Sequence, residues 1–590
     1  MSMCVLPKRV TIANALLNAL IKLPVHYIAV YADRSSLICR CLLLFPYFVI
    51  CGCWCCNCSM GETLSGGSVR DRLTATTFFA CLIVALSSWF IGGYTSALVN
   101  VPQNLIIQWI REIQCARITD HRPPLNDTQS DVVVWCSVVP ANETFLHLRG
   151  NERLAAVWSM IGCAVMLGVS LGSLATNYLV EGLGLRRTLL LYNVLEILGS
   201  IAAGCSVTTR SYELFIIGRF IFGLGNGCVV LCGVYVAELS TNKHRGALNA
   251  LATASFSAGM LVANIMGLPP ILGNPDTWQH MCWIALLPSL LFIAAYHFLP
   301  ESPRWLCRKT PDTGKLEKEL QRLRGRQNVD ADIRVLHQEV ESARKLSSQK
   351  LSLLDVLRDE FLRKILGICL LAMFAQRFTG YSAVFVYSTE MFRQCGLTQA
   401  LASYGTIILT AVCAVVALFS SPLQDMVGRR PMLLGGLVGC ALCTAAMVIF
   451  TVLTKYAVCS ACQYGTLLAM ALFMVSYALG PASAPFLFTA EMFGMNSRQA
   501  ASALGYLVNV ALATLITAVF PVMQAYLIEW TFTIFTGITL ILAVFLSRLL
   551  IETKGKSFLE IQKTLEDRFG AGAKASQEPA LSQCSDLRKC

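Results

Sequence analysis

The sequence predicts an all-α membrane protein with twelve transmembrane helices in two six-helix halves and short amphipathic intracellular helices. Three observations predict this fold: an apolar composition, twelve stretches long enough to cross a bilayer, and an internal repeat. Of the 590 residues, 55% are hydrophobic and 14% are charged, whereas a soluble chain carries about 25% charged residues. The basic residues behind the net charge of +12 cluster in short loops beside apolar stretches. That placement favours a topology signal over nucleic-acid binding.

Twelve stretches reach the roughly 20 mostly apolar residues that a membrane-spanning helix needs. They are residues 74–99, 155–179, 188–207, 213–236, 247–268, 281–299, 363–388, 401–421, 431–454, 463–489, 500–522 and 527–550. Residues 37–56 are a possible thirteenth span, weakened by Arg40, Pro46 and the cysteine-rich sequence at 51–58. That sequence suits lipidation or a plain apolar flank, and metal binding stays open. No stretch resembles a cleavable signal peptide.

Basic residues in alternate loops set the orientation. The loops before the first span and after the second, fourth and eighth spans are predicted to be cytoplasmic, because they carry Arg70, Arg72, Arg186, Arg187, Lys243, Arg245, Arg429 and Arg430. Both termini are then cytoplasmic. The expected regions are a Cys-rich N-terminal region (1–72), an N-terminal half (73–299), an intracellular helical linker (300–362), a C-terminal half (363–550) and a tail (551–590).

The long first loop, residues 100–153, is expected outside the cell. Its sequons at Asn126 and Asn142 suit N-glycosylation, and Cys115 and Cys136 are candidates for a disulfide. The linker contains "TGKLEKELQRLRG" and "ADIRVLHQEVESARKL", whose apolar spacing with charged flanks is typical of amphipathic helices. A disordered linker is the alternative.

The two halves share a sequence pattern. "AELSTNKHRGALNAL" begins at Ala237 and "AEMFGMNSRQAASAL" begins at Ala490, and both read A-E, six residues, R-x-A-x-x-A-L. "GLRR" at 184–187 and "GRR" at 428–430 form a second pair. Transporters built from two such halves hold substrate between the halves near the middle of the membrane.

Charged residues at these turns are candidates for an inner gate. Glu238 and Glu491 end apolar spans, and a carboxylate at that depth needs a partner. Ion pairs across the two halves are therefore predicted to hold the inner face shut and to break on opening. The alternative is that these charges only set topology. The predicted set is Glu238, Arg245, Arg219, Arg186, Arg187, Asp425, Arg429, Arg430, Glu491 and Arg498.

Other polar and glycine-rich sequences interrupt the spans. Thr-Gly-Tyr-Ser at 379–382 predicts a bend, and "GPASAP" at 480–485 predicts a helix break of the kind that lines a cavity. "GLGNG" at 223–227 follows no strand, so it predicts close helix packing rather than a nucleotide loop. Glu196, inside the third span, is expected to have a partner or a function that the sequence does not name.

Several motifs follow one another in the order of a known family. They are "GRFIFGLGNG", "PESPRWL", "GYSAVFVYSTEMF", "DMVGRRPMLL", "GPASAPFLFTAEMF" and "ETKGKSF". Over residues 73–560 the chain resembles the sugar porter branch of the major facilitator superfamily, specifically the animal facilitative hexose transporters. The resemblance implies the major facilitator fold, alternating access, and sugar binding mainly by the C-terminal half.

The resemblance also implies a substrate site. Gln376 and Asn509 match sugar-binding amides of the family, Glu491 matches a buried acid that helps to hold the sugar or the inner gate, and Tyr387 matches an outer-gate tyrosine. Adjacent helical residues point about 100° apart, so Arg377 need not face the sugar with Gln376. It is predicted either to pair with an acid on another helix or to mark a substrate other than glucose.

Four positions of the implied site depart from the family pattern, because an amide or a tryptophan is replaced. They are Arg377 and Thr253 in place of glutamines, Ser382 in place of an asparagine, and Phe486 in place of a tryptophan. These changes put glucose in doubt and leave fructose, another polyol, or weak or altered transport open. Proton-linked sugar porters carry an aspartate where this chain has Thr95, beside the arginine that is Arg219 here. The resemblance thus implies gradient-driven uniport and a structural role for Arg219.

Three functional hypotheses follow. The first is facilitative transport of a hexose, glucose- or fructose-like, or of a polyol across the plasma membrane. The second is an organic-ion carrier of the same superfamily, in which Arg377 would bind an anion. The third is a non-transporting sugar sensor. Outside the cysteine-rich sequence at 51–58, no nucleophile–base or metal constellation appears in the sequence, so we expect no enzyme activity, cofactor or metal site. The expected partners are a small-molecule sugar and membrane lipid.

Overall fold

The computed structural model describes residues 74–120, 152–240, 245–309, 313–347, 353–394, 396–456, 462–494, 497–527, 530–556 and 558–569. All of these residues belong to one compact unit of the chain. Within these ranges the secondary structure is helical and no strand occurs. The predicted residues Asn126, Asn142 and Cys136 and the segment 37–58 lie outside the described residues, whereas Cys115 is described and is disulfide-bonded.

The predicted spans of the N-terminal half are helices, several of them built from more than one segment. They comprise α4 (Ala75–Val84), η2 (Ala85–Phe90), α5 (Ile91–Ala97), α8 (Glu152–Leu183), α9 (Leu185–Thr208), α10 (Tyr212–Asn226), α11 (Val229–Leu239), α12 (Arg245–Met266), α13 (His280–Ile284), α14 (Leu286–Ala295) and η4 (Tyr296–Phe298). Between the first and second spans, α6 (Gln103–Asp120) belongs to the loop that is predicted to lie outside the cell. The π-helical segment η2 lies inside the first span.

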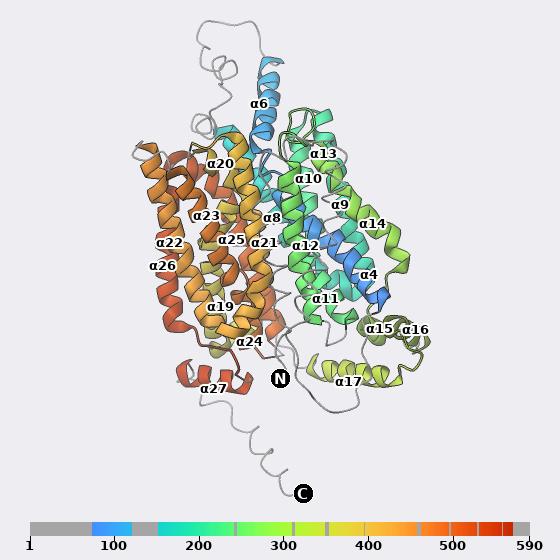
Figure 1. Cartoon of the computed structure of the whole chain (residues 1–590). Coiled ribbons are helices and arrows are strands. Elements are labelled where there is room, and N and C mark those ends of the chain that lie inside the picture. Colours follow the sequence, from blue (N-terminus) through green and yellow to red (C-terminus); the bar gives the residue numbers. More distant parts are fainter. Residues whose placement is uncertain are drawn as a thin grey trace, which may run out of the picture. The chain divides into compact units, whose positions relative to one another are not determined.

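The linker and the C-terminal half are also helical. The linker contains α15 (Pro303–Lys309), α16 (Thr313–Arg324), α17 (Asp330–Ser347) and α18 (Leu353–Arg358). The C-terminal half contains α19 (Glu360–Phe378), α20 (Tyr381–Gln394), α21 (Gln399–Val427), α22 (Arg429–Lys455), α23 (Cys462–Leu479), α24 (Ala484–Met492), α25 (Arg498–Leu527) and α26 (Thr531–Leu549), and α27 (Phe558–Phe569) follows. Figure 1 shows α6 at one end of the helical bundle and α15–α17 and α27 at the other. We call these ends the α6 side and the linker side.

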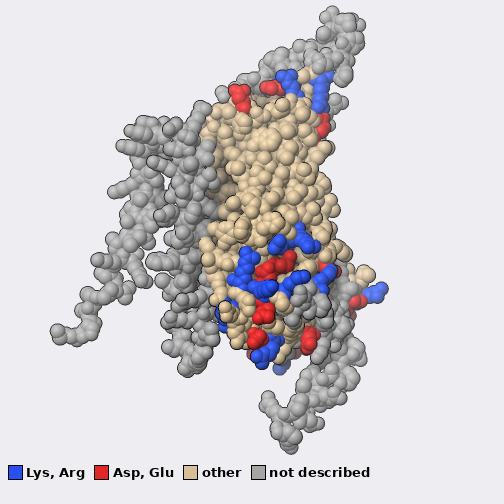
Figure 2. All heavy atoms as spheres, turned by 90° about the vertical axis from the view of Figure 1, so that its right-hand side faces the viewer, with Lys and Arg blue, Asp and Glu red and all other residues tan. Residues whose placement is uncertain are grey.

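The predicted membrane fold is confirmed. Ten helical segments of the described residues are long and apolar enough to cross a membrane, and each coincides with a predicted span. The two other predicted spans are α12, whose apolar part Ala254–Met266 is short, and the pair α19–α20, which is interrupted at Gly380. Figure 2 shows charged side chains at the two ends of the visible face and a broad band without them between.

Glycines let α8 and α10 approach very closely, as the "GLGNG" sequence predicts. A Cβ atom on Gly223 would lie 2.1 Å from the carbonyl oxygen of Val165, and one on Gly227 would lie 2.5 Å from the carbonyl carbon of Gly172. A Cβ atom on Gly168 would likewise lie 2.3 Å from the Phe220 carbonyl oxygen. Small residues spaced four apart are typical of close helix contacts in membranes. The backbones of α8 and α10 therefore pack directly against each other.

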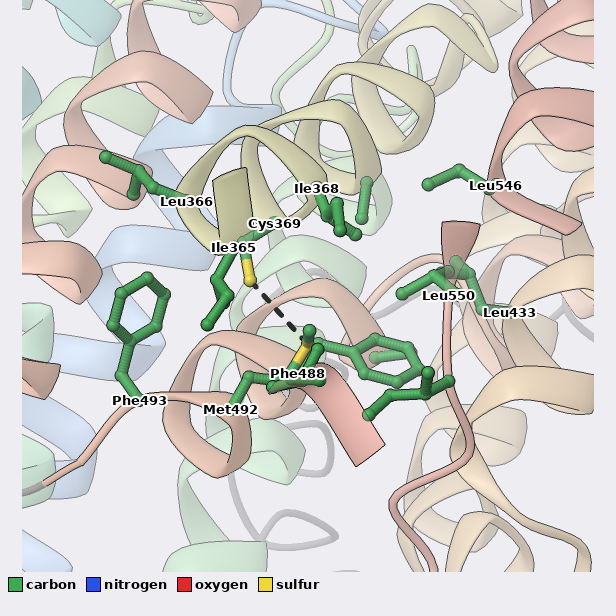
Figure 3. Close-up of a cluster of buried hydrophobic side chains, with 14 of the residues drawn as sticks. Ile365, Leu366, Ile368, Cys369, Leu433, Phe488, Met492, Phe493, Leu546 and Leu550 are labelled. Carbon is green, nitrogen blue, oxygen red and sulfur yellow. Dashed lines mark hydrogen bonds between the residues drawn. The ribbon is translucent and has the colours of Figure 1, made fainter. Parts of the chain in front are cut away.

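The C-terminal half has an apolar core on the linker side. Figure 3 shows Ile365 and Cys369 of α19 above Phe488 and Met492 of α24, with Leu433 of α22 beside them. The Cys369 and Met492 sulfur atoms lie 4.0 Å apart. The same cluster includes Ile561 and Leu565 of α27, and both are buried. The apolar stripe of α27 therefore covers the end of this half.

Candidate functional site

A cavity lies between the two halves. It has a volume of about 440 Å³ and is lined by residues of α5, α8 and α10–α12 from one half and of α19–α21 and α23–α25 from the other. Gln376, Arg377, Ser382, Phe486 and Asn509 line it, so five of the seven predicted substrate residues come together. The other two, Glu491 and Thr253, are not among its lining residues, and the side chain of Thr253 lies outside the described part of the molecule.

Asn509 connects the polar groups of this cavity. Its Nδ2 donates to Gln376 Oε1 at 2.6 Å, and its Oδ1 accepts from Arg377, with 3.0 Å to Nε and a second bond from Nη2. Arg377 Nη1 also lies 3.5 Å from Ser382 Oγ. Both Arg377 and Gln376 therefore face the cavity, and the described residues provide no acid that pairs with Arg377.

Helix breaks bring these groups into the cavity. The predicted bend at 379–382 is confirmed: α19 ends at Phe378 and α20 begins at Tyr381, with Gly380 at a φ of 87° that favours glycine. The predicted break after α23 is also confirmed, because residues 480–483 separate α23 from α24. Gln376 Nε2 donates to the Ala482 carbonyl oxygen at 2.9 Å. An amide of the cavity thus satisfies a carbonyl that the break releases.

Aromatic side chains form the apolar wall. Tyr381 and Tyr477 stack with ring centroids 3.9 Å apart and an interplanar angle of 4°, and Phe385 stacks on Tyr381 at 5.6 Å. Phe486 lies 6.5 Å from Tyr506. All five rings line the cavity. Polar groups that fix orientation beside apolar or aromatic walls are typical of small-molecule sites.

The turns on the linker side contain functional candidates that the sequence analysis missed. Gly428, at a φ of 116°, precedes α22, and the Glu552 carboxylate accepts hydrogen bonds from the amides of Arg429 at 3.1 Å and Arg430 at 3.0 Å. "GLRR" repeats this geometry, because Gly184 has a φ of 90° and Glu301 accepts from the Arg186 amide at 3.1 Å. The signal was present, since "PESPRWL" and "ETKGKSF" contain these two glutamates.

Glu301 lies just after the sixth span, and the pKa of its carboxyl is set by burial and by neighbouring groups. Burial raises the pKa of its carboxyl, while the amide hydrogen bonds from Arg186 and Ser302 and the charges of Arg186 and Arg187 oppose the rise. Arg187 itself is exposed. The Arg186 guanidinium donates to the Leu299 carbonyl oxygen at 2.9 Å and lies over the Tyr296 ring. These contacts tie the start of α9 to the end of the sixth span.

The predicted gate residues whose side chains are described form contacts within one half or with the linker, and none of these contacts is an ion pair across the halves. Glu491 Oε1 lies 3.3 Å from Arg429 Nε, and both residues belong to the C-terminal half. The Glu238 carboxylate accepts a hydrogen bond from Ser302 at the start of the linker. Arg498 Nε donates to the Phe493 carbonyl oxygen at 3.2 Å. The side chains of Arg245 and Asp425 lie outside the described residues.

Hydrogen bonds between the halves gather toward the α6 side. Asn100, just after α5, donates to the Phe385 carbonyl oxygen at 3.0 Å and to Ser388 Oγ at 3.2 Å. Asn264, near the end of α12, donates to Thr410 Oγ1 at 2.9 Å. The predicted outer-gate residue Tyr387 is buried on α20 next to these contacts, and its hydroxyl donates to the Thr517 carbonyl oxygen at 3.2 Å.

Comparison with known proteins identifies the family. The family model described as "Sugar (and other) transporter" matches residues 80–565. The chain belongs to this family. Facilitated glucose transporter member 2 of solute carrier family 2 from Mus musculus is 30% identical over 510 residues, covering 85% of this chain and 96% of that protein. Member 3 from Homo sapiens is 28% identical over 520 residues, covering 87% and 97%.

Solved structures show that this sugar transporter family member has the major facilitator fold. The inward-open xylose transporter XylE from E. coli has a TM-score of 0.63 at 19% identity, covering 83% of this chain and 99% of that chain. XylE bound to 6-bromo-6-deoxy-D-glucose, described as a major facilitator superfamily proton:xylose symporter, has a TM-score of 0.61 at 19% identity, covering 84% of this chain and all of that chain, 100%.

Two buried charges of this transporter lie outside the cavity lining. Arg219 Nη1 donates to the Thr95 carbonyl oxygen at 2.7 Å, and Asn226 Nδ2 donates to Thr95 Oγ1 at 2.9 Å. Arg219 contacts no carboxylate in the described ranges, and its structural role stays a prediction. Glu196 is 3% exposed, and its Oε2 has no hydrogen-bond partner among the described atoms. Gly225 leaves room for this carboxylate, because a Cβ there would lie 2.8 Å from Glu196 Oε1.

Proposed function

We propose that the protein is a facilitative uniporter of a hexose, a carrier and not an enzyme, which works by alternating access in the plasma membrane. The observation that carries the proposal is the Gln376–Asn509 amide pair in a cavity between the two halves. Sugar hydroxyls require neutral donors and acceptors, and the ring requires an apolar face such as the Tyr381–Tyr477 stack. The names of the relatives, facilitated glucose transporters, support the same substrate class.

Alternating access follows from the grouping of contacts. Asn100 and Asn264 connect the halves on the α6 side, whereas Glu301, Glu552 and Glu491 hold turns within their own parts of the chain on the linker side. The proposed cycle separates the halves on one side while they close on the other. The proposed orientation has both termini in the cytoplasm, which makes the α6 side the outer side. The linker-side glutamates then stabilise each half as it moves.

Transport by the purified protein in proteoliposomes tests the proposal. Radiolabelled glucose and fructose are supplied outside, and uptake is compared with that of empty liposomes and of the Asn509→Ala variant. We expect saturable uptake of at least one sugar. Net uptake should stop when the sugar concentrations inside and outside the liposomes are equal. Properly inserted protein without uptake of either sugar contradicts the proposal.

A further inference from the structure

The cavity contains one full charge. Among the described residues that line it, Arg377 is the single Asp, Glu, Lys or Arg. It lies in the last turn of α19, near the middle of the membrane-spanning pair α19–α20. A charged side chain inside a membrane is costly, and such residues usually pair or mark a substrate pathway. The question is therefore what neutralises this guanidinium.

The partners that the structure gives Arg377 are all neutral. Nε and Nη2 donate to Asn509 Oδ1, and Nη1 donates to Ser382 Oγ. A guanidinium has five N–H donors, so these three bonds leave one N–H on each terminal nitrogen. No carboxylate pairs with Arg377 within the described ranges. The C-terminus of α19 offers only a partial negative charge, about half of one unit, so net positive charge stays in the cavity.

We propose that the cavity takes an anionic sugar derivative, a hexuronate, with its carboxylate on Arg377. This inference rests on the proposed function and names its substrate class. The two remaining donors match the two oxygens of a carboxylate, which guanidinium binds in bidentate fashion. The hydroxyls of the same ligand meet Gln376 and Asn509, and its ring lies against Tyr381. A hexuronate differs from a hexose by one oxidised carbon, so the cavity of about 440 Å³ accommodates both.

A neutral substrate is the competing explanation. Arg377 would then only orient Asn509 through its two hydrogen bonds, and the α19 terminus would offset part of its charge. The two explanations differ in a measurable quantity. An anion carries its charge across the membrane, so its distribution responds to the membrane potential, whereas the distribution of a neutral sugar does not.

The experiment uses the full chain in proteoliposomes with potassium gradients and valinomycin to set the potential. Radiolabelled glucuronate and glucose are the probes. We expect saturable glucuronate uptake with an equilibrium accumulation that changes about 50-fold per 100 mV, since one elementary charge gains about 2.3 kcal/mol over that potential. Accumulation is expected on the positive side. Glucose should distribute equally at every potential.

Variants connect this behaviour to Arg377. In Arg377→Gln the ratio of glucuronate to glucose uptake is expected to fall at least tenfold. Arg377→Lys keeps the charge without the planar fork, so its glucuronate uptake should be weaker than that of the wild type but stronger than that of Arg377→Gln. Lys364→Gln is the matched control, because it removes a positive charge from the same helix at a surface pair with Glu360, where the two side chains lie 2.8 Å apart. Its uptake ratio should equal that of the wild type.

The failures of the two proposals are distinguishable. Wild-type uptake of glucose without uptake of glucuronate, and without competition by it, overturns the anion inference while the hexose proposal stands. An unchanged uptake ratio in Arg377→Gln also overturns it. If neither compound is transported, the proposed function fails. Equilibrium binding of labelled glucuronate to the purified protein then decides the inference, and absence of binding overturns it.

Discussion

The N-terminus of α22 depends on a carboxylate that arrives from the far end of the C-terminal half. Glu552 lies 123 positions after Arg429 in the chain, and its carboxylate accepts hydrogen bonds from the amides of Arg429, Arg430, Thr553 and Lys554. Glu552→Ala removes the acceptor for the first amides of α22 and for its own turn. We expect the start of α22 to open more often without unfolding the rest of the helix.

The magnitude follows from the two effects that the carboxylate combines. Loss of a helix N-cap costs about 1 kcal/mol, and loss of a partly buried negative charge at a helix N-terminus costs about 1 kcal/mol more. The sum of about 2 kcal/mol corresponds to an opening equilibrium that rises about 30-fold. Glu552→Gln keeps an acceptor oxygen and loses the charge, so about half of this free energy should be lost, or roughly fivefold.

Hydrogen–deuterium exchange followed by mass spectrometry measures this opening directly. Exchange in peptides that cover residues 428–434 should become faster by the stated factors in the two variants. Glu301→Ala is the matched control, because it removes the corresponding carboxylate from Arg186 and should leave those peptides unchanged. Exchange in Glu552→Ala within threefold of the wild type would refute the reasoning.

Three further predictions concern packing, the cavity and coupling. Gly223→Leu should abolish recovery of monodisperse protein in size-exclusion chromatography, because even its Cβ would lie 2.1 Å from the Val165 carbonyl oxygen. Gly367→Ala is the control and should behave as wild type, because a Cβ at that position would meet no atom within 4 Å. Asn509→Ala leaves Arg377 and Gln376 without a shared partner. Because an unsatisfied buried group costs about 1–3 kcal/mol, the apparent KM for the transported compound should rise at least about fivefold, and an unchanged KM would contradict the assignment. A pH gradient should drive no accumulation in the wild type, because no carboxylate contacts Arg219 in the part of the chain described by the structure, whereas concentrative uptake driven by protons would exclude uniport.

The membrane spans could be predicted from the sequence because bilayer thickness and backbone hydrogen bonding leave few solutions. Twenty apolar residues must form a helix in lipid, whatever they pack against. The breaks at Gly380 and at 480–483 were likewise predictable, since glycine and proline act locally. Close packing at Gly223 followed from the same local reasoning.

Partners distant in the sequence could not be read in this way. Glu238 was expected to pair across the halves, but its described partner is Ser302, because the chain returns to that turn after the sixth span. In the sequence, Glu301 and Glu552 were only parts of two family motifs. Their role as caps depends on the amides of Arg186 and Arg429, which lie 115 and 123 positions earlier in the chain. Whether Arg377 faces the cavity depends on where α19 ends, a matter of one or two residues that hydropathy does not resolve.

The hydrogen bond from Gln376 to the Ala482 carbonyl oxygen gives the break between α23 and α24 a thermodynamic connection to the ligand. A substrate that recruits the Gln376 amide competes with the Ala482 carbonyl for the same donor. Occupancy of the cavity then lowers the free energy needed to bend or straighten the chain at 480–483. Because such coupling is reciprocal, a change that fixes the break in one shape should alter ligand affinity by the same factor. Substrate release and the movement of α24 would then be thermodynamically coupled, so that neither equilibrium could change without the other.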